Sequence, residues 1–501
     1  MVIFMNNKPM LNAYPDSMGG TLSDIVSLLS GEDLKDVFGS FYILPSLYHS
    51  DLDRGFSVID YDINEKLADK RDLEALKRLG IDLKLDFILN HASAQSPQFV
   101  DLVNRGDRSE YRDFFIHWND FWKGYGTMTE EGYIKPDPEY LQNMFFRKPG
   151  LPLMMVQFPD GTRVPYWNTF YQEEHYPLYL GQMDLNIKSP KVWDYYKDTL
   201  AKIASYGADI VRLDAFAYAP KEPGAKNFLN EPGTWELLRK IQEIAAPYKL
   251  TLLPEIHAAY EEQIYTKIAE QGYMTYDFFL PGLVIDAIEN KRSRYLAAWA
   301  RELVEKNIRV VNMLGCHDGI PLLDLKGILP ETDIRDLIDR IVDRGGLVKN
   351  LHGQKNMYYQ VNATYLSALG DSEQKLLMAR AIQLFMPGKP QIWYLDLFAG
   401  KNDYEAVRMA GESGHKEINR TNLSMEQIGT ALKTRVVKKQ IEMIRFRNSC
   451  KAFKDGAGIR IEEDGEGILR IIWQNEECSA ELMVDLVKET YEIKETVDGS
   501  V

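Results

Sequence analysis

Short apolar segments recur along the first 400 residues of the chain and alternate with longer segments of helical spacing. Runs rich in valine, isoleucine, leucine and aromatic residues predict six buried strands, at residues 41–47, 83–89, 208–213, 250–256, 308–314 and 390–394. Residues 9–14 and 276–280 are weaker strand candidates. Apolar positions three to four residues apart predict helices between many of these strands, for example at residues 73–79, 191–205, 234–246 and 374–384.

Near-continuous apolar strands that alternate with helices are typical of a parallel sheet with both faces covered. Eight such units predict an α/β fold in which the sheet closes into a (β/α)8 TIM barrel. The functional side chains of such a barrel lie at the C-terminal ends of its strands. The sequence therefore predicts that reactive groups gather at these strand ends.

Two segments interrupt the alternation, and a third replaces it. Residues 93–186 lack steady periodicity and predict a small domain inserted after the third strand, and residues 325–366 predict a second inserted segment. After residue 456 the pattern changes to alternating strands, which predicts a small C-terminal all-β domain. The predicted division is residues 1–92, 187–324 and 367–455 for the barrel, 93–186 and 325–366 for the insertions, and 456–501 for the C-terminal domain.

Composition narrows the class of partner. The 501 residues carry 59 basic and 74 acidic side chains, a formal net charge of −15, so neither nucleic acid nor an anionic membrane surface is expected as a partner. Three cysteines, Cys316, Cys450 and Cys478, are too few for a disulfide framework. The sequence contains neither an apolar run of about 20 residues nor the features of a secretory signal, which predicts a cytoplasmic protein.

Three carboxylates follow predicted strands and suggest cleavage of a glycosidic bond. Asp214, Glu255 and Asp318 each lie at a strand end and beside a basic or imidazole side chain. Cleavage with retention needs one carboxylate as nucleophile and one carboxylic acid to protonate the leaving oxygen. A third anion can stabilise the positive charge that develops on the sugar ring.

The neighbours of these carboxylates suggest how each is tuned. Arg212 and Asp214 are two residues apart on a strand and share a face, so we expect the guanidinium to lower the pKa of Asp214. Glu255 follows an apolar strand, and we expect desolvation to raise its pKa, as suits a general acid. Each motif taken alone has a structural alternative. Arg212 and Asp214 could be a buried ion pair, and Glu255 could be a solvated glutamate at a strand end. His317 and Asp318 could be a helix-cap pair.

Other strand ends offer groups that bind sugar. His91 ends the third strand and can donate a hydrogen bond to a hydroxyl, although a lone histidine is more often a satisfied core residue. Asp53 and Phe56 come after the second strand and offer a carboxylate for hydroxyls and an aromatic face for the ring.

These motifs, spread over nearly the whole chain, resemble the α-amylase superfamily of glycoside hydrolases and, within it, the sucrose phosphorylase subfamily. The strand-end carboxylate motifs carry the superfamily resemblance. The subfamily resemblance is carried by residues 212–218, 317–320, 359–369 and 399–403, with further matches at residues 14–17, 417–420 and 445–448.

The resemblance implies a double displacement without cofactor or metal. Asp214 would be the nucleophile, Glu255 the acid/base and Asp318 the transition-state stabiliser. Inorganic phosphate would release α-glucose 1-phosphate from a covalent β-glucosyl enzyme. The residues implied to bind the donor glucose are Asp53, Phe56, His91, Arg212, His317 and Arg420.

The same resemblance points to loops that bind phosphate and the acceptor sugar. The family's phosphate-binding arginine falls on Arg147 or Lys148, with a solvated basic pair as the alternative. Tyr359 and Gln360 match residues that alternate between acceptor and phosphate. The subfamily also implies that the chain can form a homodimer.

The acceptor half departs from typical sucrose phosphorylases. Met357 stands where many of them have an aspartate that contacts fructose. The loop before it is basic and favours an anionic acceptor, with His352 and Lys355 as candidates beside Arg344 and Lys349.

The sequence predicts a phosphorylase of sucrose. Alternatives are phosphorylases of sucrose 6'-phosphate or glucosylglycerate and, less favoured, a hydrolase or transglucosylase. Three retained carboxylates argue against a non-catalytic module.

Overall fold

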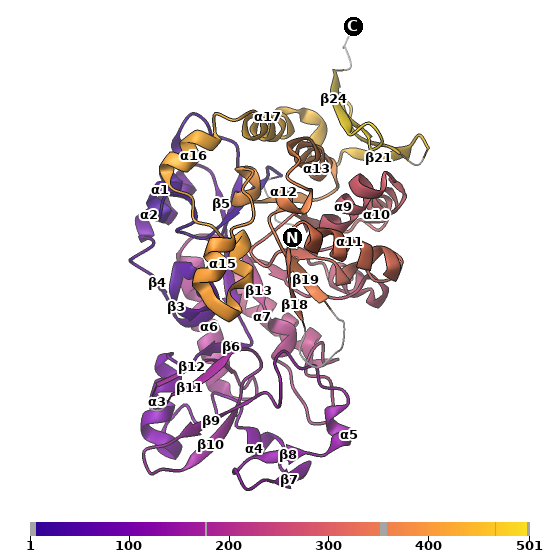
Figure 1. Ribbon diagram of the computed structural model, residues 1–501. Helices are drawn as coiled ribbons and strands as arrows, with labels where there is room; N and C mark the ends of the chain where they lie inside the picture. The colour runs from indigo at the N-terminus through magenta and orange to yellow at the C-terminus, as the bar shows by residue number, and fades with distance from the viewer. Residues whose placement is uncertain (1–6, 176–177, 351–357, 466, 498–501) are drawn as a thin grey trace.

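The computed structural model describes residues 7–175, 178–350, 358–465 and 467–497. Its centre is an eight-stranded sheet in which every hydrogen-bonded pair of neighbouring strands is parallel. The strands at its two ends, β14 and β15, lie in contact and close a barrel. Helices lie around this barrel (Figure 1). In chain order the strands are β1 (Met10–Ala13), β2 (Ser40–Ile43), β5 (Asp82–Ile88), β13 (Ala208–Asp214), β14 (Thr251–Pro254), β15 (Thr275–Asp277), β16 (Val310–Asn312) and β20 (Lys389–Trp393).

All eight predicted strands are present, and the TIM barrel is confirmed. Several are shorter than the apolar runs that predicted them. Residues 45–47 form a 3₁₀ turn after β2, and Leu280 begins a helix instead of ending a strand. These residues are buried by tertiary packing outside the sheet, which hydrophobicity alone does not distinguish from burial within it.

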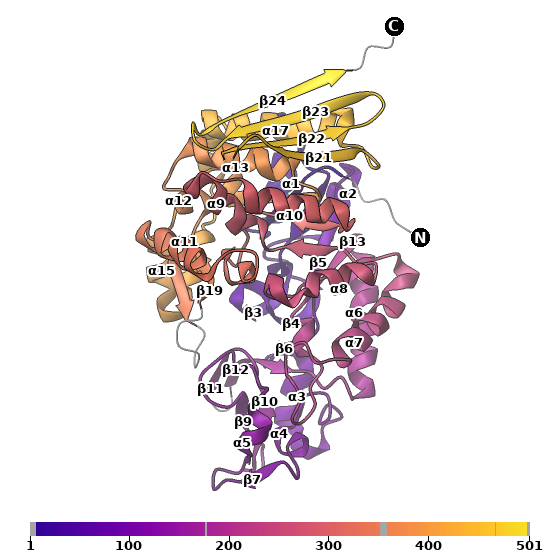
Figure 2. The same cartoon turned by 90° about the vertical axis from the view of Figure 1, so that its right-hand side faces the viewer.

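Helices surround the barrel, and their apolar faces pack on the strands (Figure 2). The helices predicted at residues 73–79, 191–205, 234–246 and 374–384 are confirmed within one to three residues at most of their ends. The helices of this layer are α1 (Leu22–Ser30), α2 (Lys70–Arg78), α6 (Pro190–Ser205), α7 (Gly233–Ala245), α8 (Ile264–Glu270), α9 (Leu280–Asn290), α10 (Arg294–Glu305), α13 (Glu373–Phe385) and α17 (Arg435–Ser449).

The segment between β5 and α6 forms a separate lobe at one end of the molecule (Figure 1). It has its own apolar cluster, which includes Trp118, Trp122 and Trp167. Its elements are β6 (His91–Ser93), α3 (Pro97–Arg105), α4 (Trp118–Phe121), β7 (Gly126–Met128), β8 (Ile134–Pro136), α5 (Pro138–Leu141), β9 (Leu153–Gln157), β10 (Arg163–Trp167), β11 (Gln172–His175) and β12 (Leu178–Asp184). Because β6 pairs with β12, the two ends of the lobe are joined where they leave the barrel.

Further short elements lie in the connections between barrel strands and after the last of them. These are β3 (Tyr48–Leu52), β4 (Ser57–Ile63), β17 (Ile320–Pro321), α11 (Glu331–Asp343), β18 (Leu347–Asn350), β19 (Tyr358–Asn362), α12 (Tyr365–Ala368), α14 (Tyr394–Leu397), α15 (Tyr404–Ala410) and α16 (Met425–Ala431). In the predicted second insertion, β19 pairs with both β17 and β18.

The chain ends in a four-stranded antiparallel sheet that lies over α10, α13 and α17 (Figure 2). Its strands are β21 (Gly458–Glu463), β22 (Ile468–Gln474), β23 (Cys478–Asp485) and β24 (Thr490–Val497). Within the described ranges no helix has the length and apolarity needed to cross a membrane. We propose the six-segment division given above as the domain organisation, because the inserted lobe and the terminal sheet each have a sheet of their own.

Candidate active site

A cavity of about 580 Å³ opens at the C-terminal ends of the barrel strands, between the barrel and the inserted lobe. Its volume is in the range that holds a disaccharide-sized ligand. Eleven of the residues singled out from the sequence line it: Asp53, Phe56, His91, Arg147, Lys148, Asp214, Glu255, His317, Asp318, Gln360 and Arg420.

Arg212 lies behind this cavity wall and joins the two leading carboxylates. Its Nη1 is 2.8 Å from Asp214 Oδ1, and its Nη2 is 2.7 Å from Glu255 Oε1. Nη1 also lies 2.6 Å from Asp86 Oδ1, at the bottom of the site. The guanidinium is 2% exposed, so it fixes the positions of both carboxylates from within the barrel.

This geometry reverses the pKa shifts expected from the sequence. Burial, together with the charges of Glu255 and Asp86, raises the pKa of Asp214 well above its usual value despite Arg212. Burial also acts to raise the pKa of Glu255, but Arg212 and His257 outweigh it and hold that pKa at about 2. Each expected contribution is present, but the net directions expected were wrong: burial outweighs Arg212 at Asp214, and Arg212 with His257 outweighs burial at Glu255.

His257 is a site residue that the sequence analysis did not select. Its Nε2 is 3.6 Å from Glu255 Oε1, and its Nδ1 is 3.2 Å from Asp324 Oδ2. Burial acts against the charged imidazole, but Asp324 and Glu255 raise the pKa of His257 to about 9. The signal was present: residues 255 and 257 share the two-residue spacing that drew attention to Arg212 and Asp214.

We expect His257 to make stability depend on pH in the alkaline range. A pKa raised from 6.5 to about 9 gives a stabilisation that is full below pH 6.5 and disappears as the pH rises to about 9. Replacing His257 by Asn removes this dependence, which amounts to about 3 kcal/mol. The measurement is urea unfolding of wild type and His257→Asn at pH 6.5, 7.5 and 9.

A matched control is His117→Asn in the inserted lobe. Burial lowers the pKa of His117, so between pH 6.5 and 9 its loss should leave the slope of wild-type stability unchanged. Equal slopes for wild type and His257→Asn would show that His257 is not held in its charged form.

Asp318 and Asp53 face each other across a pair of cations. Lys416 Nζ lies 2.7 Å from Asp318 Oδ1 and 3.4 Å from Asp53 Oδ2. Arg420 Nη1 lies 3.3 Å from Asp53 Oδ1. Burial acts to raise the pKa of Asp318, but His317 and Lys416 lower it well below its usual range, so this carboxylate is ionised. Lys416 was missed, although it lies only four residues before Arg420 in the sequence.

Phe56 and the two predicted histidines form one wall of the cavity. The Phe56 ring stacks on His317 with centroids 4.9 Å apart, and the Arg212 guanidinium lies 5.4 Å from the Phe56 centroid. His91 Nε2 is 2.9 Å from the Phe56 carbonyl oxygen and 3.2 Å from Gln182. Burial lowers the pKa of both histidines, so they are neutral hydrogen-bonding groups.

Two strained turns present this wall and the carboxylate beside it. Asp53 and Arg54 have φ of 47° and 49°, and the next residue, Gly55, has φ of 117°. A Cβ on Gly55 would lie 2.1 Å from the backbone nitrogen of Ser46, so only glycine fits. Ala215, directly after Asp214, has φ of 50°. Left-handed backbone at non-glycine residues costs free energy and concentrates at functional sites.

Comparison with known proteins accords with this geometry. Residues 19–318 match the family model described as "Alpha amylase, catalytic domain". A sucrose 6(F)-phosphate phosphorylase of Ilumatobacter coccineus is 52% identical over 98% of this chain and 96% of its own length. A sucrose phosphorylase of Streptococcus mutans is 34% identical over 98% of each chain. The crystal structure of sucrose 6F-phosphate phosphorylase from Thermoanaerobacter thermosaccharolyticum superposes with a TM-score of 0.90, at 33% identity and over 99% and 98% of the two chains.

The chain belongs to the α-amylase family, in its sucrose phosphorylase subfamily. It is therefore an enzyme, and the cavity at the barrel mouth is its candidate active site.

In this subfamily member the two candidate phosphate-binding residues have different partners. The Arg147 guanidinium lies 5.7 Å from the Phe170 centroid and 6.0 Å from the Tyr218 centroid, all of them in the cavity wall. The Lys148 ammonium donates to the side chains of Asn168 and Gln172, within the inserted lobe. Arg147 is thus placed over the cavity by aromatic rings, whereas Lys148 is anchored to the lobe.

The acceptor loop is described only in part. Gln360, on β19, lines the cavity, and the backbone of Tyr359 precedes it on the same strand. His352 and Lys355 lie outside the described residues. Arg344 is engaged elsewhere: its guanidinium is 2.9 Å from Glu289 and donates to the carbonyl of Ala368, so it supports the packing of the loop base.

Proposed function

We propose that this enzyme transfers a glucosyl unit from an α-glucoside to inorganic phosphate with retention of configuration. The observation that carries the proposal is the Arg212 fork, which holds Asp214 and Glu255 together in a sugar-sized cavity with ionised Asp318 close by. Both carboxylates bind one guanidinium and so lie close together, and a short separation of the two is typical of retaining enzymes.

In the first step Asp214 attacks the anomeric carbon while the bond from that carbon to the leaving oxygen breaks. Glu255 gives its proton to that oxygen, and the product is a β-glucosyl ester of Asp214. Phe56 offers its face to the ring, and Asp53, His91, His317 and Arg420 offer partners to its hydroxyls.

In the second step a phosphate oxygen attacks the same carbon, and the ester bond to Asp214 breaks. The proton of the attacking phosphate passes to Glu255, which restores the acid and releases α-glucose 1-phosphate. Arg147 supplies the positive charge that this anion needs.

The pKa shifts add one requirement to this scheme. In the structure Asp214 is the group that favours a proton and Glu255 is the anion, opposite to the roles in the first step. When substrate binds, the proton favoured at Asp214 must therefore pass to Glu255, which leaves Asp214 ionised for attack and Glu255 able to protonate the leaving oxygen. The His257 imidazolium lies 3.6 Å from Glu255 and is held charged by Asp324, so it keeps its own proton.

We further propose that the leaving sugar is fructose 6-phosphate, so that the substrate is sucrose 6F-phosphate. The relative of that name is 52% identical, whereas the sucrose phosphorylase of Streptococcus mutans is 34% identical. The basic acceptor loop and the missing aspartate at Met357 favour the same choice. Sucrose itself is the second candidate substrate, because it carries the same glucosyl unit for the donor half of the site to bind.

The test compares sucrose 6F-phosphate with sucrose, each with and without inorganic phosphate. We expect kcat/KM for the phosphorylated substrate to be at least about tenfold higher, since an added charge-assisted hydrogen bond is worth about 1.5–3 kcal/mol. Glucose 1-phosphate should form only when phosphate is present. Higher efficiency on sucrose would overturn the choice of acceptor, and phosphate-independent release of glucose would indicate a hydrolase.

In the reverse direction, glucose 1-phosphate offered with fructose, fructose 6-phosphate, glycerate and glycerol tests the remaining alternatives. We propose that the enzyme is cytoplasmic and that its retaining chemistry works without a cofactor. We also propose that it can form a homodimer, as the subfamily resemblance implies.

A further inference from the structure

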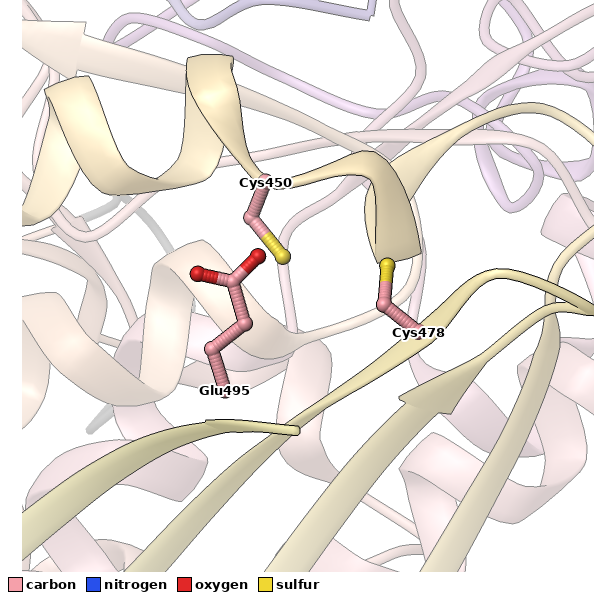
Figure 3. A group of neighbouring side chains, drawn as sticks. All are labelled: Cys450, Cys478 and Glu495. Carbon is pink, nitrogen blue, oxygen red and sulfur yellow. The ribbon is translucent and has the colours of Figure 1, made fainter. Parts of the chain in front are cut away.

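Three ligand-type side chains meet where the barrel joins the C-terminal sheet. Cys450 lies directly after α17, Cys478 begins β23, and Glu495 lies on β24 (Figure 3). One ligand atom from each lies within 4.8 Å of the other two. The cysteines are 5% and 2% exposed, while Glu495, near the end of the edge strand, is exposed.

The strand register makes the position of Glu495 unusual. Glu495 pairs with Ala480 and Ile493 pairs with Leu482, and both partners on β23 are buried. Side chains two apart on a strand share a face, so Glu495 lies on the same side of the sheet as Ile493 and Cys478, the side that packs on the helices. Inward-pointing charges on edge strands often have no role beyond preventing aggregation. This one, however, lies beside two thiols.

A buried cation lies close to Cys450. Arg447, one turn before Cys450, is 5% exposed and stacks on Phe453 and Trp473, with its guanidinium carbon 4.0 Å and 4.9 Å from their ring centroids. In the part of the chain that the structure describes, its Nε has no hydrogen-bond partner. Arg447 interacts electrostatically with Cys450 and also with Lys389, a second buried cation, so a thiolate at Cys450 would compensate buried positive charge.

We propose that Cys450, Cys478 and Glu495 bind one divalent cation of the zinc class, with the fourth position of the tetrahedron open to water. Zinc–thiolate bonds of about 2.3 Å require sulfur atoms about 3.8 Å apart, so the side chains need to close by only about 1 Å. Two thiolates and a carboxylate on a dication carry one net negative charge, which Arg447 balances.

Binding is an exchange of protons for metal. Two thiols each lose a proton, and both protons go to the solvent as two metal–sulfur bonds form. Burial raises the pKa of the Cys450 thiol to about 12, and its hydrogen bond to Glu495 acts in the same direction, so the metal must displace a firmly held proton. A bound cation would tie the C-terminal sheet to the end of α17 and stabilise their junction.

The experiment titrates the full-length, reduced and metal-free enzyme with Co²⁺. We expect one equivalent to give the intense visible absorption of tetrahedral cobalt with thiolate ligands, and one equivalent of Zn²⁺ to remove it. Cys450→Ser and Cys478→Ser should each lose this spectrum, and Glu495→Gln should weaken Co²⁺ binding at least tenfold. Zn²⁺ should raise the melting temperature of wild type but not that of Cys478→Ser.

Glu477→Gln is the matched control. Glu477 is adjacent to Cys478 in sequence but pairs with Lys451 and Lys454 at the surface, so its loss should leave the cobalt spectrum unchanged. A weak octahedral spectrum, or binding that survives in Cys450→Ser, would overturn the proposal. The proposal would also be overturned if Glu495→Gln bound Co²⁺ as tightly as wild type does, since this substitution is exposed and should leave folding intact. Air oxidation of wild type to a Cys450–Cys478 disulfide in the presence of equimolar Zn²⁺ would also overturn it.

Discussion

Asp214→Asn is expected to lower kcat by about 10⁴-fold or more on every glucosyl donor, because the amide cannot form the glycosyl ester. The glucosyl ring of the donor should bind in nearly the same position, since Arg212 still binds Glu255 and Asp86. The loss should therefore appear in kcat, with little change in donor affinity. Steady-state rates with sucrose 6F-phosphate and with α-glucosyl fluoride measure it.

Stability provides the control for this variant. The raised pKa of Asp214 means that the folded state favours the neutral form, and asparagine is always neutral. The melting temperature at neutral pH should therefore equal or exceed that of wild type. Mass spectrometry of wild type reacted with α-glucosyl fluoride should find one hexose on the peptide that contains Asp214. Near-normal turnover by a well-folded Asp214→Asn would refute its role as nucleophile.

Glu255→Gln is expected to discriminate between leaving groups. A departing sugar oxygen needs a proton, and loss of the acid should cost about 10²–10⁴-fold with a natural donor. Fluoride leaves without protonation, so formation of the glucosyl enzyme from α-glucosyl fluoride should fall less than about tenfold. Pre-steady-state fluoride release and glucose 1-phosphate formation from the natural donor separate the two effects.

Asp214→Asn is the internal comparison, because its activity should fall by the same factor with α-glucosyl fluoride and with the natural donor. Arg212 retains two carboxylate partners in Glu255→Gln, so this variant should stay folded. An equal loss on fluoride and on the natural donor would argue against an acid at position 255 and favour a purely structural role for its ion pair.

Part of this site could be predicted from local sequence because its determinants are local. Apolar runs of strand length predicted each barrel strand, and the topology then placed Asp214, Glu255 and Asp318 at one face of the barrel. The C-terminal sheet followed from strict alternation. The ends of the strands could not be predicted as well. Residues 45–47 were predicted as part of a strand because they are apolar, but they form a 3₁₀ turn that is buried outside the sheet.

The charged interior of the barrel could not be predicted in the same way. Lys84 and Asp86 lie within a strand that its apolar neighbours already define, and both are fully buried. Lys84 contacts Gln391, and Asp86 contacts Arg212 and the Tyr42 hydroxyl. Arg212 and Tyr42 lie on the two strands that pair with β5, whereas Gln391 lies on β20, three strands away, so these contacts depend on the order of strands in the sheet and on its curvature.

The sequence by itself determined the fold, the carboxylates and the end of the barrel at which they lie, because strand periodicity and parallel topology are properties of short segments. Tertiary structure alone decided the direction in which the pKa of each carboxyl group shifts. Arg212 is shared between two strands, His257 is charged through Asp324 sixty-seven residues away, and Lys416 reaches Asp318 from ninety-eight residues away. Electrostatic energies depend on distances between atoms, and only the closed barrel sets those distances.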